Sequence, residues 1–534
     1  MIFAYRVHAA DQSKKASPES AGYGRIDLPL LLLFSLQFIF ILFVAKNTVD
    51  WPHADDYVFI EWFRQSESGK RLWEFWIDAH VASHPLGTQA IISVLFFRYF
   101  GVHFEYIIYI SIFAIIFSQL IIFTLFRGCS DIWRCGAVIV LCIAFFHPIQ
   151  SSHIFWAFEL GWFLVNFFVI INLFLVEKDI KGGWVFAILG CLLASSSSAQ
   201  GLFSWVALGL HVAIKPSVHR RGIMIAASAI GFILTLGYIN YLSEHYDSAR
   251  THNSLGIYIP YLIRLFGSVF ATRSEITSLQ LGSGVIFVLF IIIVQTVKLK
   301  VATSRVRAGA TLIIFSILCL AAFAVGRASF GFGWVASHFH MGPLLVPLVL
   351  GMGILCLEIW FQPALSMRSK VPSLAFLFFI FSSIVPALRF GESEIRDGAE
   401  ERMLAKSTFC GGRFPEWVVA SVNLSIENID LYRRSAPFVA PLCDGDKDPR
   451  TERILEMPAL FQKMVASNPA ASSALYDLWI AYIIHGDLRR AFPLEDPLYA
   501  DKLLAFAISN AASGSHYDPK LLRPHAAYFI GLKQ

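Results

Sequence analysis

The sequence is poor in charged residues, since Asp, Glu, Lys and Arg together make up only 15% of its 534 residues. A water-soluble domain carries about 25% charged residues, so most of the surface of this chain cannot face water. The few charges are also nearly balanced, and the net charge of +5 is too small for a chain of this length to indicate a nucleic-acid partner. The composition excludes a soluble cytosolic enzyme, a disordered protein, a coiled coil and a collagen.

Several reactive motifs are missing as well. The eight Cys residues show no CxxC or Cys/His spacing typical of a zinc site. Six of them lie in or beside apolar segments and behave as small apolar residues. The other two, Cys410 and Cys443, could form a disulfide in an oxidising compartment, with two separately buried thiols as the alternative. The run Ser195–Ser198 lacks a GxSxG or Ser-x-x-Lys context, which favours a packed polar hairpin over a nucleophile.

Apolar residues are abundant: they make up 56% of the chain and include 49 Phe. Many gather in runs of about 20 residues, the length that crosses the hydrocarbon core of a bilayer. The sequence therefore predicts an all-α polytopic membrane protein with about 11 transmembrane helices. The predicted spans are 28–45, 104–126, 135–148, 158–176, 184–198, 201–214, 222–242, 282–297, 308–325, 341–361 and 371–389.

Some apolar segments are too short for a simple span. Segments 184–198 and 201–214 hold barely fifteen residues each, so this pair could form a hairpin that enters the bilayer without crossing it. Segment 86–100 ends in Arg98 and predicts a short helix under the first outer loop. Segment 257–270 predicts an interfacial helix that would offer a groove to a lipid tail, with a solvated loop as the alternative.

Lys and Arg concentrate in alternate connecting segments, which places those segments and the N-terminus in the cytoplasm. Three parts follow: a cytoplasmic tail (1–27), a transmembrane domain (28–389) and an extracytoplasmic domain (390–534). In the last part charge returns and apolar residues recur at helical spacing, so we expect a small, mostly helical domain.

The first outer loop, 47–87, carries the most informative polar residues. His53, Asp55 and Asp56 directly follow the first span, and His84 lies further along. Four Trp residues within 26 positions of this loop indicate a helix lying in the headgroup plane. Adjacent carboxylates repel each other, which raises one pKa and creates a base or a metal ligand. The alternative is an ordinary acidic loop with an aromatic belt.

An acidic pair directly after the first span, followed by interfacial helices, resembles the GT-C superfamily of integral-membrane glycosyltransferases. Segment 326–331, which contains Arg327, and segment 337–339 resemble a recurring block of bacterial membrane proteins of this type. That block usually runs Gly-Arg, a Gly a few residues on, then Ser-Arg-Tyr. Here His338 and Phe339 stand in place of the Arg and the Tyr.

A further segment, 146–150 followed by 156–160, resembles the same group, with Glu159 where Gln is more usual. An ionisable group near a membrane boundary indicates a functional site, although Glu159 could equally face outer water. The resemblance spans roughly residues 28–389 and does not reach the C-terminal part.

The resemblance implies an enzyme of the bacterial inner membrane that takes sugar from a polyprenyl-phosphate carrier on the extracytoplasmic face. The acceptor would be a glycan or lipid of the cell envelope. Asp55 or Asp56 would act as general base in a single displacement that inverts the anomeric carbon. Arg327 or a divalent cation would stabilise the departing phosphate, with a side chain that reaches the lipid headgroups as the alternative role of Arg327. His53, His84, Glu159 and His338 are the further candidate substrate-binding residues.

The main alternative is a transporter or flippase of a lipid-linked saccharide without catalysis. Such a protein is expected to carry broken or charged helices at the midplane and matching repeats in its two halves. The polar residues here lie mostly at the outer rim and no such repeat is evident, which favours the enzyme. A membrane scaffold that binds partners through its outer domain is a third possibility.

Overall fold

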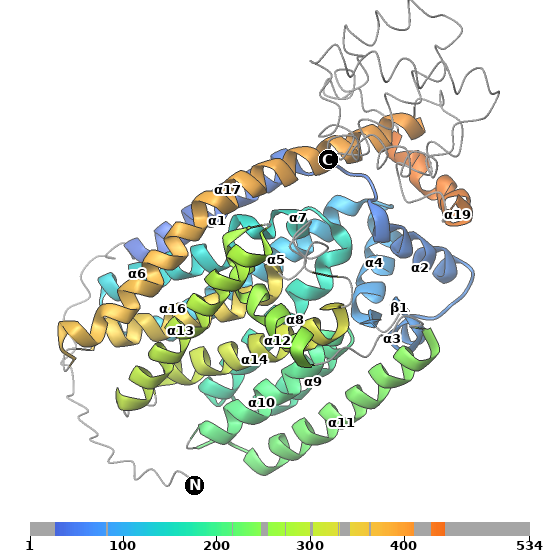
Figure 1. Ribbon diagram of the computed structural model, residues 1–534. Coiled ribbons are helices and arrows are strands. Elements are labelled where there is room, and N and C mark those ends of the chain that lie inside the picture. Colours follow the sequence, from blue (N-terminus) through green and yellow to red (C-terminus); the bar gives the residue numbers. More distant parts are fainter. Residues whose placement is uncertain are drawn as a thin grey trace, which may run out of the picture.

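The computed structural model describes residues 27–81, 84–215, 217–246, 255–272, 274–299, 303–328, 331, 342–362, 365–410 and 429–443. Within these ranges the chain is almost entirely helical (Figure 1). The strands among them are β1 (His80–Val81) and β2 (His84–Pro85), which form one antiparallel hairpin.

Nine helical segments of the described chain are long and apolar enough to cross a membrane, which indicates a multi-pass membrane protein. They match nine of the eleven predicted spans. A helix pairs its own backbone N–H and C=O groups, and this is what an apolar segment in lipid requires. Their helices are α1 (Leu28–Asn47), α5 (Phe104–Phe123), α6 (Asp131–Phe145), α8 (Leu160–Lys178), α11 (Arg221–Tyr246), α13 (Glu275–Leu299), α14 (Ser304–Arg327), α16 (Gly342–Trp360) and α17 (Met367–Cys410).

The other two predicted spans form a pair of shorter helices, α9 (Gly183–Ser195) and α10 (Leu202–Ile214), joined through η5 (Ala199–Gly201). Thirteen residues extend about 20 Å along a helix, less than the ~30 Å of a hydrocarbon core. The turn between them meets the first loop, because Gln89 Nε2 donates to the carbonyl of Ser197 across 2.8 Å. This geometry agrees with a hairpin that ends inside the protein.

The first loop forms η1 (Ala54–Asp56), α2 (Tyr57–Glu67), α3 (Leu72–Asp78) and α4 (Gly87–Phe100), with α2 and α3 packed on α4. The expected aromatic helix is present, and so is the short helix beneath it. Phe75 of α3 is fully buried, whereas Trp73 and Ile77 are exposed, so α3 presents apolar side chains outward, as a helix in the headgroup plane does. We call the end of the bundle that carries these elements the loop end.

Helix α12 (Leu255–Gly267) and η6 (Ser268–Phe270) form the helix predicted for 257–270. Helix α12 packs antiparallel on α13 at very short range. A Cβ on Gly267 would lie 1.9 Å from the carbonyl oxygen of Ser278, and one on Gly282 would lie 1.8 Å from that of Ile263. Both positions therefore require glycine.

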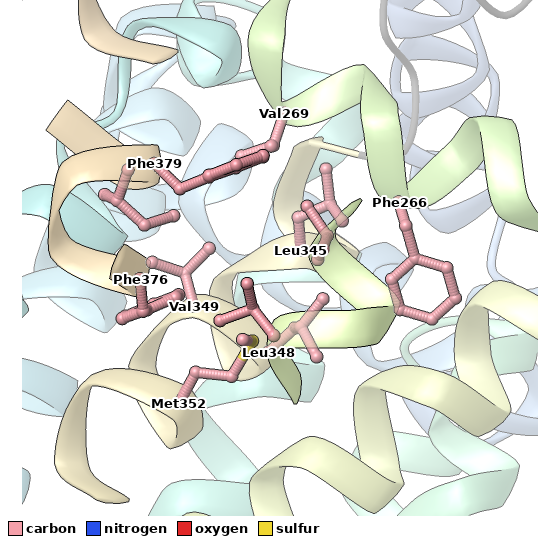
Figure 2. A pocket seen from close by; sticks show the side chains of 11 residues that line it. Phe266, Val269, Leu345, Leu348, Val349, Met352, Phe376 and Phe379 are labelled. Atoms are coloured by element: carbon pink, nitrogen blue, oxygen red, sulfur yellow. The ribbon is translucent and has the colours of Figure 1, made fainter. Parts of the chain in front are cut away.

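A small cavity lies where α12, α13, α16 and α17 meet (Figure 2). Its volume is about 20 Å³ and its lining side chains are all apolar, among them Phe266, Leu348 and Phe379. A water molecule there would find no hydrogen-bonding side chain, so the cavity is a dry gap in packing.

Helix α17 is the longest element, with 44 residues that extend about 66 Å. This is about twice the thickness of a hydrocarbon core, so one part of α17 projects beyond the membrane. The helix continues without a break through residue 390, where the sequence predicts the start of the outer domain. Residues 411–428 and 444–534 lie outside the described residues, and the predicted helical domain there stays a prediction.

The loop end of α17 is cross-linked to a short C-terminal pair, α19 (Ile429–Val439) and η9 (Ala440–Cys443). Cys410 and Cys443 form a disulfide with their Cα atoms 5.5 Å apart, which confirms the predicted pairing. Phe438 of α19 packs on Phe63 of α2, with ring centroids 6.0 Å apart. The C-terminal elements therefore cover the first loop (Figure 1).

The opposite end of the bundle is held by buried ion pairs. Glu177 of α8 binds Arg307 of α14 at 2.6 Å and His211 of α10 at 3.0 Å. Glu358 of α16 pairs with Arg305 of α14. Each charged group has an opposite partner on another helix, so these residues act as structural ties.

Candidate functional site

Asp56 is the most deeply buried acidic residue of the first loop. It ends η1 and is only 2% exposed. Its Oδ1 accepts the backbone N–H of Phe158 at 2.7 Å, and its Oδ2 accepts that of His53 at 3.0 Å. Burial raises the pKa of Asp56 to about 8, although the two N–H donors and the charge of Arg402 oppose the shift. The carboxyl group thus titrates close to neutral pH and fastens the loop to the segment before α8.

That segment comprises η3 (Pro148–Gln150), α7 (Ser151–Ile154) and η4 (Ala157–Glu159). The indole Nε1 of Trp156 donates to the carbonyl of His53 at 3.2 Å, and the two rings pack edge to face. His53 therefore contributes its backbone N–H, its carbonyl and its ring to one junction.

Asp55 differs from its neighbour because its side chain is exposed. Protein atoms nevertheless surround the carboxylate closely enough that loss of hydration raises its pKa, and the negative charge of Glu159 raises it further. Of the two adjacent aspartates, Asp55 is the one that a substrate can reach.

Glu159 is 5% exposed and ends η4. Its Oε1 lies 3.8 Å from Nδ1 of His153, and its Oε2 has no hydrogen-bond partner among the described residues. A buried carboxylate oxygen is costly without a hydrogen-bond partner, so Oε2 of Glu159 needs one from outside the described residues. The negative charge of Glu159 acts on Asp55, and the imidazole of His153 lies beside Glu159, so the three residues are neighbours at the loop end.

The positive charge beside Asp56 comes from Arg402 on α17, which is buried. Sequence reasoning did not select this residue, because it lies far along the chain within the predicted outer domain. Charged residues return after residue 390, but this pattern does not predict which of their side chains is buried.

Arg327 lies in a second group at the loop end. Its Nη2 is 3.4 Å from Nε2 of His84 on β2, and its charge acts on Tyr261 of α12. Two of the predicted substrate-binding residues are thus brought together. Asp55 and Asp56 are instead grouped with Glu159 and Arg402. His338 lies outside the described residues.

A chain of side-chain contacts links the two groups. The His153 ring, next to Glu159, stacks on Trp162 with centroids 6.5 Å apart. Trp162 meets Phe323 edge to face at 6.2 Å, and Phe323 lies one helical turn before Arg327. Both groups therefore belong to one end of the bundle, with Trp162 between them.

A third cluster, formed by Asp50, His103 and Glu105, has its ligand atoms within 4.8 Å of one another. Asp50 Oδ2 is 2.6 Å from Nδ1 of His103, while Oδ1 accepts the N–H of Phe104 at 2.7 Å. Both Asp50 oxygens thus have hydrogen-bond partners, and the first backbone donors of α5 are satisfied. We assign this cluster to the start of α5 and not to a metal.

Comparison of the chain with protein-family models, with curated proteins and with solved structures finds no match.

Proposed function

We propose that this protein is a membrane glycosyltransferase of GT-C type. It moves a sugar from a polyprenyl-phosphate carrier to a glycan or lipid acceptor of the cell envelope. One observation carries the proposal: an exposed carboxylate with a raised pKa, Asp55, lies beside a buried carboxylate whose Oε2 has no described partner, Glu159, at the loop end of a membrane bundle. Such a pair is what a base for proton removal at a membrane surface needs.

In this reaction Asp55 acts as the general base. The acceptor hydroxyl loses its proton to Asp55 while its oxygen bonds to the anomeric carbon. The bond from that carbon to the carrier phosphate breaks, and its electron pair leaves with the phosphate. Attack from the face opposite the leaving group inverts the carbon. Asp56 is a positioning residue, since its oxygens hold backbone N–H groups.

The departing phosphate gains negative charge and needs a cation nearby. Arg327 with His84 supplies this group, because a guanidinium matches phosphate geometry and stays charged. A bound divalent cation would supply further positive charge for the phosphate.

The proposed location is the bacterial inner membrane, with the N-terminus in the cytoplasm and the loop end outside. Two observations support this orientation: alternate segments are basic, and the Cys410–Cys443 disulfide at the loop end suits an oxidising compartment. On this proposal the nine long helices cross the membrane, α9 and α10 enter it as a short hairpin, and residues 390–534 form an extracytoplasmic helical part.

The test uses the full chain in nanodiscs with tritium-labelled polyprenyl-phosphate sugars extracted from membranes, and a membrane extract as acceptor. The readout is release of polyprenyl phosphate with label on the acceptor. Asp55→Asn should slow release by at least about a hundredfold. The control Glu67→Gln, at the exposed end of α2, should leave it unchanged.

Two outcomes would overturn the proposal. One is a normal rate of release with Asp55→Asn. The other is transbilayer movement of the intact labelled lipid by the wild type in proteoliposomes, without any release of phosphate, which would identify a transporter.

A further inference from the structure

An open cavity of about 860 Å³ lies between the loop-end halves of α1 and α17, with the η3–α7 segment as its floor. Its walls are mainly apolar and include Phe40 and Phe43 of α1, Phe155, and Leu388 and Met403 of α17. We call this cavity the α1–α17 groove. Its volume suits a large ligand, since small-molecule sites are typically 300–1,000 Å³.

The surface around the opening of the groove is apolar. On α1 the side chains of Phe38, Ile39 and Leu42 are exposed, and on α17 those of Phe381 and Val385 are exposed. Both helices are candidate membrane spans, so these apolar side chains face the bilayer. A ligand therefore enters the groove sideways from the membrane.

The groove is elongated. Its lining extends from Leu388 to Met403 on α17, fifteen residue steps that correspond to about 22 Å of helix. This length accommodates an extended hydrocarbon chain. A peptide backbone would find few hydrogen-bonding partners along such apolar walls, which disfavours it as the occupant.

Polar side chains also line the groove: Asn47 at the end of α1, and Glu392 and Arg396 one turn apart on α17. A guanidinium binds phosphate, while a carboxylate and an amide accept and donate hydrogen bonds to hydroxyl groups. A bare anion would be repelled by Glu392. The set therefore complements a headgroup that carries both a phosphate and hydroxyls.

The groove ends next to the proposed catalytic residues. Met403 directly follows Arg402, whose charge acts on Asp56. Phe155 directly precedes Trp156, which donates to the carbonyl of His53. The lining of the groove therefore adjoins, along the chain, two residues that interact with the acidic pair or with His53 beside it.

We propose that the α1–α17 groove binds the donor lipid, with its isoprenoid chain along α17 and its sugar phosphate at Glu392 and Arg396. This inference rests on the proposed function, since it names the place where the carrier of that reaction docks. The groove is thus a docking position, and for transfer the sugar phosphate moves past Phe155 and Met403 to the acidic pair and Arg327.

The experiment probes binding without chemistry. The full chain in phosphatidylcholine nanodiscs is illuminated with a polyprenyl phosphate that carries a diazirine in its chain, and cross-linked peptides are mapped by mass spectrometry. Cross-links are expected in 40–47 and 388–403. Unlabelled polyprenyl phosphate should compete at least about tenfold better than phosphatidylglycerol.

Matched variants on α17 sharpen the test. Leu388→Trp narrows the groove and should lower cross-linking about tenfold, whereas Val385→Trp, three residues away on the lipid-facing side, should not. Both positions are exposed, so neither substitution disturbs the core. Arg396→Gln should weaken competition by the phosphate lipid.

Cross-links spread evenly over the lipid-facing helices, or equal competition by phosphatidylglycerol, would overturn the inference. Asp55→Asn should cross-link as the wild type does, because no bond is broken. Specific cross-links without any sugar transfer would instead count against the proposed function, so the two failures are distinguishable.

Discussion

The Oδ1 atom of Asp56 accepts the backbone N–H of Phe158 across 2.7 Å. This bond joins a residue that precedes α5 in the chain to one that follows α6. The second carboxylate oxygen is committed to the N–H of His53. A carboxylate that accepts two backbone donors has a structural task, and this leaves the exposed neighbour Asp55 for the proton transfer that we propose.

Substitution of Asp56 by Asn should destabilise the protein. The amide keeps one acceptor oxygen but turns an NH₂ group toward a backbone donor, leaving a buried N–H without its partner. A loss of about 1–3 kcal/mol is expected. Thermal unfolding in detergent measures it, with Asp55→Asn as the matched control of unchanged stability. An Asp56→Asn protein that unfolds at the wild-type temperature would disprove the structural task.

The pH dependence of transfer should respond to Glu159. The negative charge of Glu159 raises the pKa of Asp55, and a base works only when it is deprotonated. Glu159→Gln removes this charge, lowers the pKa of Asp55 and should move the acid limb of kcat/KM to lower pH. The profile of Glu67→Gln should stay in place. A shift to higher pH in Glu159→Gln would contradict the arrangement.

Arg327→Lys should raise the KM for the donor about tenfold, because an ammonium group keeps the charge but loses the planar guanidinium contact. Steady-state kinetics at several donor concentrations measures it. The control Arg71→Lys lies on an exposed surface of the first loop. An unchanged KM in Arg327→Lys would remove this residue from phosphate binding.

The disulfide should be present in the native membrane. Cys410 and Cys443 are 33 residues apart, and closing a loop of that size stabilises a protein by about 3–4 kcal/mol in the chain-entropy model. After unfolding, mass spectrometry should find both thiols unlabelled unless a reductant was added first. Full labelling without reductant would refute the bond. The double variant Cys410→Ser/Cys443→Ser should unfold at lower temperature.

The nine long membrane helices were predictable, because runs of about 20 apolar residues leave few other structures available in lipid. The boundary predicted at residue 390, between membrane domain and outer domain, was harder to predict from the sequence. Hydropathy falls there, but residues 390–410 contain four Glu, two Arg and two Ala, which favour a helix. The fall in hydropathy indicates where a membrane segment ends, and it gives no information on where a helix ends.

The candidate site was predictable in part. The sequence predicted Asp55 and Asp56 as site residues because they directly follow an apolar run. It predicted Glu159 because this residue lies near a membrane boundary. Which of the two aspartates is buried depends on the turn geometry of η1. Two adjacent and identical side chains give no indication of that geometry. The proximity of Arg402 to Asp56 depends on tertiary packing between distant parts of the chain, and no periodic pattern records it.

The position of Arg402 on the last long helix also sets an order for biosynthesis. A ribosome makes the first loop early, but Asp56 receives its counter-charge only after more than three hundred further residues have been translated and α17 has been inserted. Nascent chains that stop before residue 402 therefore carry an incomplete junction, however well their earlier helices are embedded. The acidic pair acquires its final surroundings as one of the last events of membrane assembly.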